Sequence, residues 1–231
     1  MTIVAMRAFD RAEARDQRTL VERISSAIQG DILEGRLCPG DRLEEPVLSR
    51  KYAVSRTPIR EALRQLASTR LVEIRPRAGA VVASPTAGEI IDLFELVAEL
   101  EGVAARLATE RLDRSDLAAI EEAHAICQKA ARGDDDAAYY RVNGDFHLAI
   151  HKAAKNVVLR KELQALDTRL SPYRRFITFR AGRTQTALKE HDQILRALQK
   201  RDSSLAQAAM SDHVRILGED AVALVRGLRV G

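Results

Sequence analysis

Five histidines, all in the second half of the chain, are the side chains best suited to hold a metal ion. Asn143 and His147 are four residues apart in the run RVNGDFH, so on a helix they share one face and their donor atoms can meet at one ion. His191 and His213 lie on two later segments, and three helices facing one interior could deliver these four ligands. His147 and His151 form a competing pair at the same spacing. Spacing alone leaves the choice open, because a lone histidine more often fills a core or surface position.

A second group of residues suits contact with nucleic acid. Arg56, Arg60 and Arg64 recur every four residues, which places them on one face of a helix. The planar fork of an arginine can bind guanine through two hydrogen bonds, and each such pair discriminates against the wrong base by about 1–3 kcal/mol. Ser55 and Thr57, at the start of the same segment, can donate to phosphates, which the backbone amides of a helix start also attract. The plainer alternative is a solvated helix face whose arginines form ion pairs with nearby acids.

The position of the charge matters more than its size. The formal net charge is only +4. Residues 1–85 hold 15 Lys and Arg against 11 Asp and Glu, whereas residues 86–231 hold 22 against 22, so the whole excess is amino-terminal. It is most focused between Arg50 and Arg77, where eight basic residues face only Glu61 and Glu73. Such a patch indicates a polyanionic partner.

The helices that would carry the arginines follow from apolar spacing. Apolar residues recur at helical intervals over 20–33, and a short helix is expected over 43–52. A third helix contains the arginine face beside a narrow apolar stripe. Either Ser55 or Thr57 can cap this third helix, and Pro58 fits its first turn in both cases. Three closely spaced helices of this kind are typical of a helix-turn-helix.

A small hairpin is expected directly after these helices. The runs 71–74 and 80–82 are β-prone and flank a basic tip. On that tip Arg75 and Arg77 can reach the minor groove or the backbone of a bound duplex, and Gly79 can supply the turn conformation. Helices followed by such a hairpin predict a winged helix-turn-helix.

Beyond Ser84-Pro85 the pattern is helical throughout. Thr86 followed by Glu89 has the spacing of a capping box, which marks the start of a new helix. Helical segments are expected at roughly 87–110, 114–132, 135–154, 157–180, 185–200 and 203–226. The predicted fold class is mainly α, with a winged helix-turn-helix before an all-α bundle of about six helices. The expected divisions are a tail at 1–17, a winged domain at 18–83, a linker at 84–88 and a helical domain at 89–231.

The remaining composition excludes several classes of protein. Cys38 and Cys127 are far apart and fit neither a disulfide framework nor a paired-cysteine metal motif, so a reducing, cytoplasmic compartment is expected. No apolar stretch near the start has signal-peptide length, and no segment reaches the roughly 18 apolar residues of a membrane span. The sequence also lacks an HExxH pair, a glycine-rich phosphate loop and an activated nucleophile. We therefore expect a soluble protein that is not an enzyme.

The amino-terminal motifs resemble those of a known family. The runs PGDRL, VSRTPIREAL and RAGAVV are similar to the GntR family of bacterial regulators, and SRTPIREAL is close to that family's recognition-helix signature. The resemblance implies that operator DNA contacts four residues of this segment: Ser55, Arg56, Thr57 and Arg60.

The helical half resembles the FCD effector domain of the FadR subgroup of that family. The resemblance is carried by LFELVAELEGVAARL, by NGDFHLAIHKAAKN and by the later histidines. In that family a divalent metal, often zinc or nickel, is held by an Asp or Asn four residues before the histidine of an FH pair and by two later histidines. The resemblance therefore implies a zinc or nickel site formed by four residues: Asn143, His147, His191 and His213.

Two positions depart from many relatives. Asn143 stands where many have Asp, and a neutral amide is a poorer ligand for a hard cation, which bears on metal affinity and choice. Val97 stands in the first helix of the domain where many have an arginine that contacts a carboxylate. Arg174 or Arg175 can take over that contact, and Arg174 is the effector-binding residue we predict.

Together these observations predict a ligand-responsive transcriptional repressor. Two copies are expected to form a homodimer whose winged domains bind the half-sites of a near-palindromic double-stranded operator. A small organic acid in the helical domain would release the protein, with the metal either anchoring the acid's carboxylate or serving structure alone. Two rival functions are a metal-dependent enzyme with a DNA-binding appendage and an architectural DNA binder. The lack of catalytic motifs counts against the first, and the size of the neutral helical part counts against the second.

Overall fold

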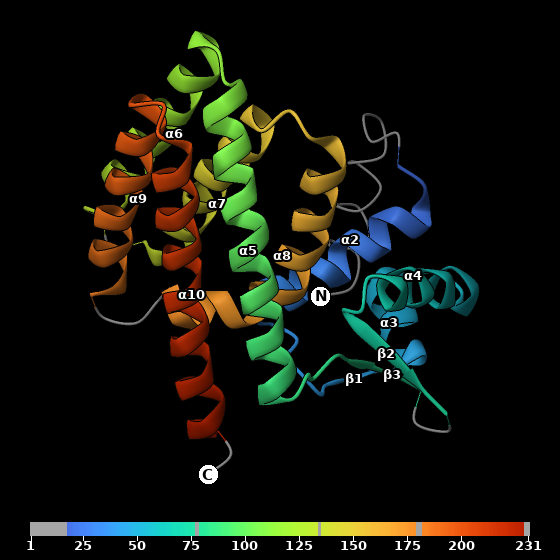
Figure 1. The fold of residues 1–231 in the computed structure, drawn as a ribbon. Coiled ribbons are helices and arrows are strands. Elements are labelled where there is room, and N and C mark those ends of the chain that lie inside the picture. The colour runs from blue at the N-terminus through green and yellow to red at the C-terminus, as the bar shows by residue number, and fades with distance from the viewer. Residues whose placement is uncertain (1–17, 77–78, 134, 179–181, 229–231) are drawn as a thin grey trace. The chain divides into compact units, whose positions relative to one another are not determined.

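The computed structural model describes residues 18–76, 79–133, 135–178 and 182–228, and the chain divides into two compact units between Ser84 and Pro85 (Figure 1). Each unit has its own apolar core. In the described part of the chain, none of the helices has the length and apolarity needed to cross a membrane.

The first unit is a small helical domain with a three-stranded sheet. Its helices are α2 (Leu20–Leu33), α3 (Glu45–Tyr52) and α4 (Arg56–Ser68), and its strands are β1 (Arg42–Leu43), β2 (Val72–Arg75) and β3 (Gly79–Val82). The strands lie in the order β1-β3-β2 and are antiparallel. The apolar stripes of α2 and α4 face each other and bury Ile24, Ile28, Ile32, Ile59, Leu63 and Leu66. This arrangement confirms the predicted winged helix-turn-helix.

The expectation that a helix begins at Leu43 was wrong. Arg42 and Leu43 form β1, in which Leu43 pairs with Ala80 of β3. The side chain of Leu43 is 3% exposed, so it joins the core from the strand instead of from a helix. Glu44 then takes the N-cap position, and Pro46 lies in the first turn of α3, where a missing backbone N–H costs nothing.

The second unit is entirely helical in its described residues. It consists of α5 (Ala87–Arg111), α6 (Arg114–Ala130), α7 (Asp136–Ala153), α8 (Val157–Thr178), α9 (Arg183–Gln199) and α10 (Ser203–Leu228). The predicted capping box forms at the start of α5, where Thr86 Oγ1 accepts from the Glu89 amide at 3.2 Å and Glu89 Oε2 accepts from the Thr86 amide at 2.8 Å. The predicted linker 84–88 therefore includes the first residues of α5.

Helix α5 is the centre of this unit, since α7, α8, α9 and α10 all pack against it. Figure 1 shows α10 lying alongside α5. Ser211 of α10 donates from its hydroxyl to the carbonyl of Ala98 at 3.0 Å, which fixes the two helices closely together. Because α7, α9 and α10 surround one helix, side chains from distant parts of the sequence can meet beside it.

The close approach of α5 and α10 depends on Gly102. A Cβ atom at this position would lie 2.2 Å from Ser211 Oγ and 3.0 Å from the backbone oxygen of Gln207. We expect Gly102→Ala to lower the free energy of unfolding by about 1–3 kcal/mol, because the helices must separate or Ser211 must give up its hydrogen bond. Urea denaturation measures this. Gly88→Ala in the same helix is the control, since its Cβ would meet only Thr86 Oγ1 at 4.0 Å, and an equal loss in both variants would contradict the close packing.

Candidate functional site

The recognition-helix residues lie on the solvent side of α4. The helix begins at Arg56 after the N-cap residue Ser55, whose side chain makes no capping hydrogen bond. Ser55, Arg56, Thr57 and Arg60 are all exposed, while Ile59, on the neighbouring stripe of the helix, is fully buried. The buried stripe thus orients the helix, and the predicted DNA-contacting side chains project away from the core of their unit.

Two arginines of α4 form exposed ion pairs. Arg60 donates from Nε to the carboxylate of Glu45 at 2.8 Å, which links α4 to the start of α3. Arg64 pairs with Glu61 at 3.0 Å, as expected if this face were only a solvated helix surface with ion pairs. Among the described residues no ion pair involves Arg56. Exposed pairs of this kind contribute at most about 1 kcal/mol, so a phosphate or a base can displace them.

The hairpin places Arg75 and Gly79 opposite each other at the end of the β2–β3 ladder. Gly79 has φ +77°, a conformation that glycine adopts without strain. Arg75 is half exposed and pairs with Glu73 at 2.8 Å. Arg77, the other predicted contact of the tip, lies outside the described residues.

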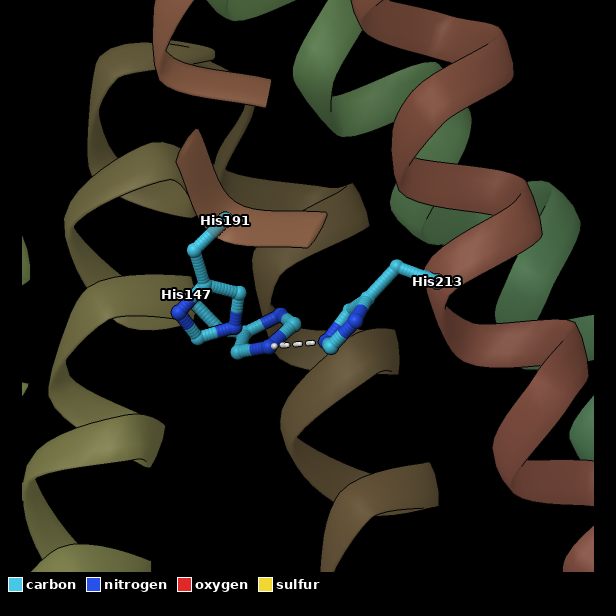
Figure 2. A group of neighbouring side chains, drawn as sticks. All are labelled: His147, His191 and His213. Carbon is cyan, nitrogen blue, oxygen red and sulfur yellow. Dashed lines mark hydrogen bonds between the residues drawn. The ribbon is translucent and has the colours of Figure 1, made fainter. Parts of the chain in front are cut away.

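Three of the four predicted metal ligands come together in the helical unit. His147 of α7, His191 of α9 and His213 of α10 each offer a ring nitrogen, and these atoms all lie within 4.8 Å of one another. In Figure 2 the three rings converge from separate helices. Their exposed fractions are 4%, 0% and 2%. Such a buried group of imidazoles has the donor atoms that zinc and nickel prefer.

Two carboxylates, Glu190 and Glu101, lie beside ring nitrogens of this group. His213 Nδ1 lies 2.5 Å from Glu190 Oε2, so it donates to that carboxylate and the lone pair of the neutral ring is on Nε2. His147 Nδ1 lies 3.5 Å from Glu101 Oε2 and has no hydrogen-bond partner among the described residues. The Nε2 atoms of His147 and His213 are 3.3 Å apart. Figure 2 marks a hydrogen bond between these two atoms, in which one ring carries the proton that a cation bound by both rings would replace.

The ring of His191 is also suited to coordinate a metal. Neither of its ring nitrogens has a hydrogen-bond partner among the described residues, although the side chain is fully buried. Burial, and then the charges of the neighbouring histidines and Arg183, hold the pKa of His191 well below its ordinary value. Burial likewise lowers the pKa of His213. Both rings are therefore neutral at neutral pH, which is the form that coordinates metal.

The competing histidine, His151, has a different partner. Its Nε2 donates to Glu101 Oε2 at 2.8 Å. Burial lowers the pKa of His151, but the charge and the hydrogen bond of Glu101, together with the charge of Asp167, raise it above its ordinary value. Glu101, His147 and His151 form a second group with ligand atoms within 4.8 Å. Its strong internal ion pair makes the first group, with its unpartnered nitrogens, the better candidate for a metal.

A cavity of about 310 Å³ adjoins the histidines and has His147 and His213 in its wall. Asn143, the fourth predicted ligand, is half buried and lines the same cavity one helical turn before His147. Arg174 also lines it and is buried, with Nη1 donating to Asp167. The side chain of Arg175 lies outside the described part of the chain. Val97 is 1% exposed and belongs to the core of the unit.

Three charged residues of this site were not assigned a role from the sequence. Glu101 faces His147 and His151, Glu190 accepts from His213, and Arg183 lines the cavity. A signal for Glu101 was available, because it lies seven residues after Phe94 on the apolar stripe of its helix, where an acid needs a partner. Arg183 and Glu190 are seven residues apart on α9 and share one face of it, but the helix was expected to begin only at residue 185, which left Arg183 outside it.

Comparison with protein families divides the chain at the same place as the structure. Residues 20–82 match the model of the bacterial regulatory proteins of the gntR family. Residues 92–216 match the model of the FCD domain, which covers more than half of the chain.

Individual relatives agree with the family matches. The chain is 28% identical over 184 residues to an uncharacterized HTH-type transcriptional regulator, YdhC, of Bacillus subtilis, covering 79% of this chain and 82% of the relative. It is 25% identical over 201 residues to the HTH-type transcriptional repressor RspR of Escherichia coli, covering 86% and 87%. The solved structure of E. coli McbR/YncC has a TM-score of 0.75 at 23% identity, covering 92% of this chain and all of that one, and shows a shared fold.

Proposed function

The chain belongs to the gntR family of bacterial regulatory proteins and carries an FCD domain, and from this premise we propose that it is a homodimeric repressor that a small organic acid releases from its operator. Proteins of this kind are DNA-binding transcriptional regulators, and the FCD domain is their ligand-binding effector domain. The similarity to RspR, which is named a repressor, supports the direction of control.

In this proposal α4 enters the major groove of the operator. Arg56 and Arg60 contact base edges, and Ser55 and Thr57 donate to phosphates. The exposure of all four residues and the free hydroxyl of the N-cap support these roles. The hairpin, with Arg75, Arg77 and Gly79, lies over the adjacent minor groove or backbone.

The helical unit binds zinc or nickel and the acid. The observation that carries this part is the pair of Nε2 atoms of His147 and His213, 3.3 Å apart, beside the unpartnered ring of His191. With Asn143 they would form the ligand set, and the bound metal would supply a Lewis-acid position for a carboxylate. Arg174 in the cavity wall is a further proposed contact for the acid.

Release of DNA requires that the acid prefer one arrangement of the two DNA-binding heads. Helix α5 is the element through which this can occur, because it carries Glu101 beside the histidines and begins just after the end of the DNA-binding unit. A ligand that moves α7, α9 or α10 against α5 would thereby act on the residues 84–88.

A screen of small organic acids tests the proposal. We expect at least one acid to raise the melting temperature of the zinc-loaded protein and to weaken its binding to its own promoter region by about 5- to 150-fold, the usual range of coupling between two sites. Thermal shift and fluorescence anisotropy measure the two effects, each with and without zinc. An acid that acts equally on metal-free protein would contradict the metal's role. If no acid stabilises or releases the protein, the architectural alternative is favoured.

A further inference from the structure

Glu190 contacts both Arg183, which lines the cavity, and His213, one of the three grouped histidines. Arg183 donates from Nη2 to Glu190 Oε2 at 2.9 Å and from Nη1 to Oε1 at 3.2 Å. The same Oε2 accepts from His213 Nδ1 at 2.5 Å. One carboxylate therefore serves both a guanidinium and an imidazole, and whatever alters its bond to one alters its bond to the other.

Arg183 has the features of an anion-binding residue. Its side chain is 6% exposed, it lines the cavity beside Thr184 and Ala187, and its Nε is buried without a hydrogen-bond partner among the described residues. A buried N–H of a charged group that lacks an acceptor is costly, and a carboxylate oxygen is the acceptor that offsets the cost best. Among the described residues the carboxylate that Arg183 contacts is that of Glu190, which is already shared with His213.

We propose that Arg183 binds the carboxylate of the acid and that, through Glu190, this contact strengthens metal binding at His213 and its neighbours. This inference rests on the proposed metal site. Without an anion, Arg183 pairs with the Glu190 carboxylate, and its positive charge repels a metal cation at the histidines. A carboxylate placed against Arg183 offsets that charge and leaves Glu190 to orient and polarise His213. By linkage, the metal strengthens binding of the carboxylate by the same factor.

Zinc alone tests the electrostatic part of the proposal. We expect Arg183→Gln to bind zinc at least about fivefold more tightly than the unmodified protein, because the opposing charge is gone. Glu190→Gln should bind zinc about 10- to 100-fold more weakly, as is usual when the partner of a metal-bound histidine is lost. Competition with a chromophoric chelator gives the affinities, and circular dichroism checks that each variant is folded. Arg201→Gln is the matched control, because Arg201 donates to the carbonyls of Thr109 and Leu112 and does not line the cavity.

Sodium acetate, compared with sodium chloride at equal ionic strength, tests the anion part. Acetate should tighten zinc binding by the unmodified protein and by Arg201→Gln, and should leave Arg183→Gln nearly unchanged. An equal effect of acetate on Arg183→Gln shows that the anion binds the metal alone, which overturns the proposal. Zinc binding that Arg183→Gln weakens, or that acetate does not tighten in the unmodified protein, overturns it as well. If the unmodified protein binds no zinc, the metal site itself is wrong and this inference fails with it.

Discussion

Alanine in place of Arg56 or Arg60 is expected to weaken binding of the protein to its own promoter region about 10- to 100-fold, since a bidentate arginine–guanine pair contributes about 1–3 kcal/mol. Arg56 follows the N-cap directly, and Arg60 lies one turn further along the exposed face of α4. Glu45 contacts Arg60 only through Nε, so the terminal nitrogens of Arg60 have no partner among the described residues and can reach a base. Both side chains therefore have the position and the donors that base recognition needs.

Fluorescence anisotropy at several salt concentrations separates base contacts from phosphate contacts. A lost base contact relaxes the sequence preference, whereas a lost phosphate contact weakens binding to all sequences and reduces the salt slope by about 1. Arg106→Ala is the control, because Arg106 has the same charge and pairs with Glu110 in the other unit. If Arg56→Ala and Arg60→Ala bind as tightly and as selectively as the control, α4 is not the recognition helix.

The DNA-binding unit could be predicted in most respects because its signals are local. The spacing of Ile24, Ile28 and Ile32 and that of Ile59 and Leu63 fix two helices, and each buries the stripe that the spacing indicates. Strand β1 escaped prediction because two residues carry no periodicity. Leu43 is extended only because β3 lies beside it, and that neighbour is more than 30 residues away in sequence.

The candidate metal site could also be predicted only in part. Residue type and spacing indicated Asn143, His147, His191 and His213 as candidates, and the family resemblance favoured these four over the competing pair of His147 and His151. Which histidine Glu101 and Glu190 contact could not be derived, because each carboxylate reaches a histidine of another helix. The rotation of each helix about its axis decides such contacts, and it results from packing of the whole bundle.

Replacement of His191 by leucine is expected to change metal binding and stability in opposite directions. The affinity for zinc should fall more than about 100-fold, beyond the usual cost of losing a residue that only supports a ligand. The metal-free protein should become more stable, because an unpartnered buried polar group costs about 1–3 kcal/mol and leucine removes it. Chelator competition measures the first effect, and urea denaturation in the presence of a chelator measures the second.

His124→Leu is the matched control for both effects, on zinc affinity and on the stability of the metal-free protein. His124 is also buried, with its ring centroid 6.0 Å from that of His191 and its Nδ1 without a partner among the described residues, but its Nε2 pairs with Asp192 at 2.7 Å and it does not belong to the group of three. Its replacement should leave zinc affinity nearly unchanged and should not stabilise the metal-free protein, since a hydrogen-bonded pair is lost. A buried, unpartnered histidine lowers the stability of the metal-free protein, and a metal that binds it offsets this loss in the loaded protein. If the metal-free His191→Leu protein is less stable than the unmodified one, His191 contributes to packing instead. That result would contradict the proposed metal site.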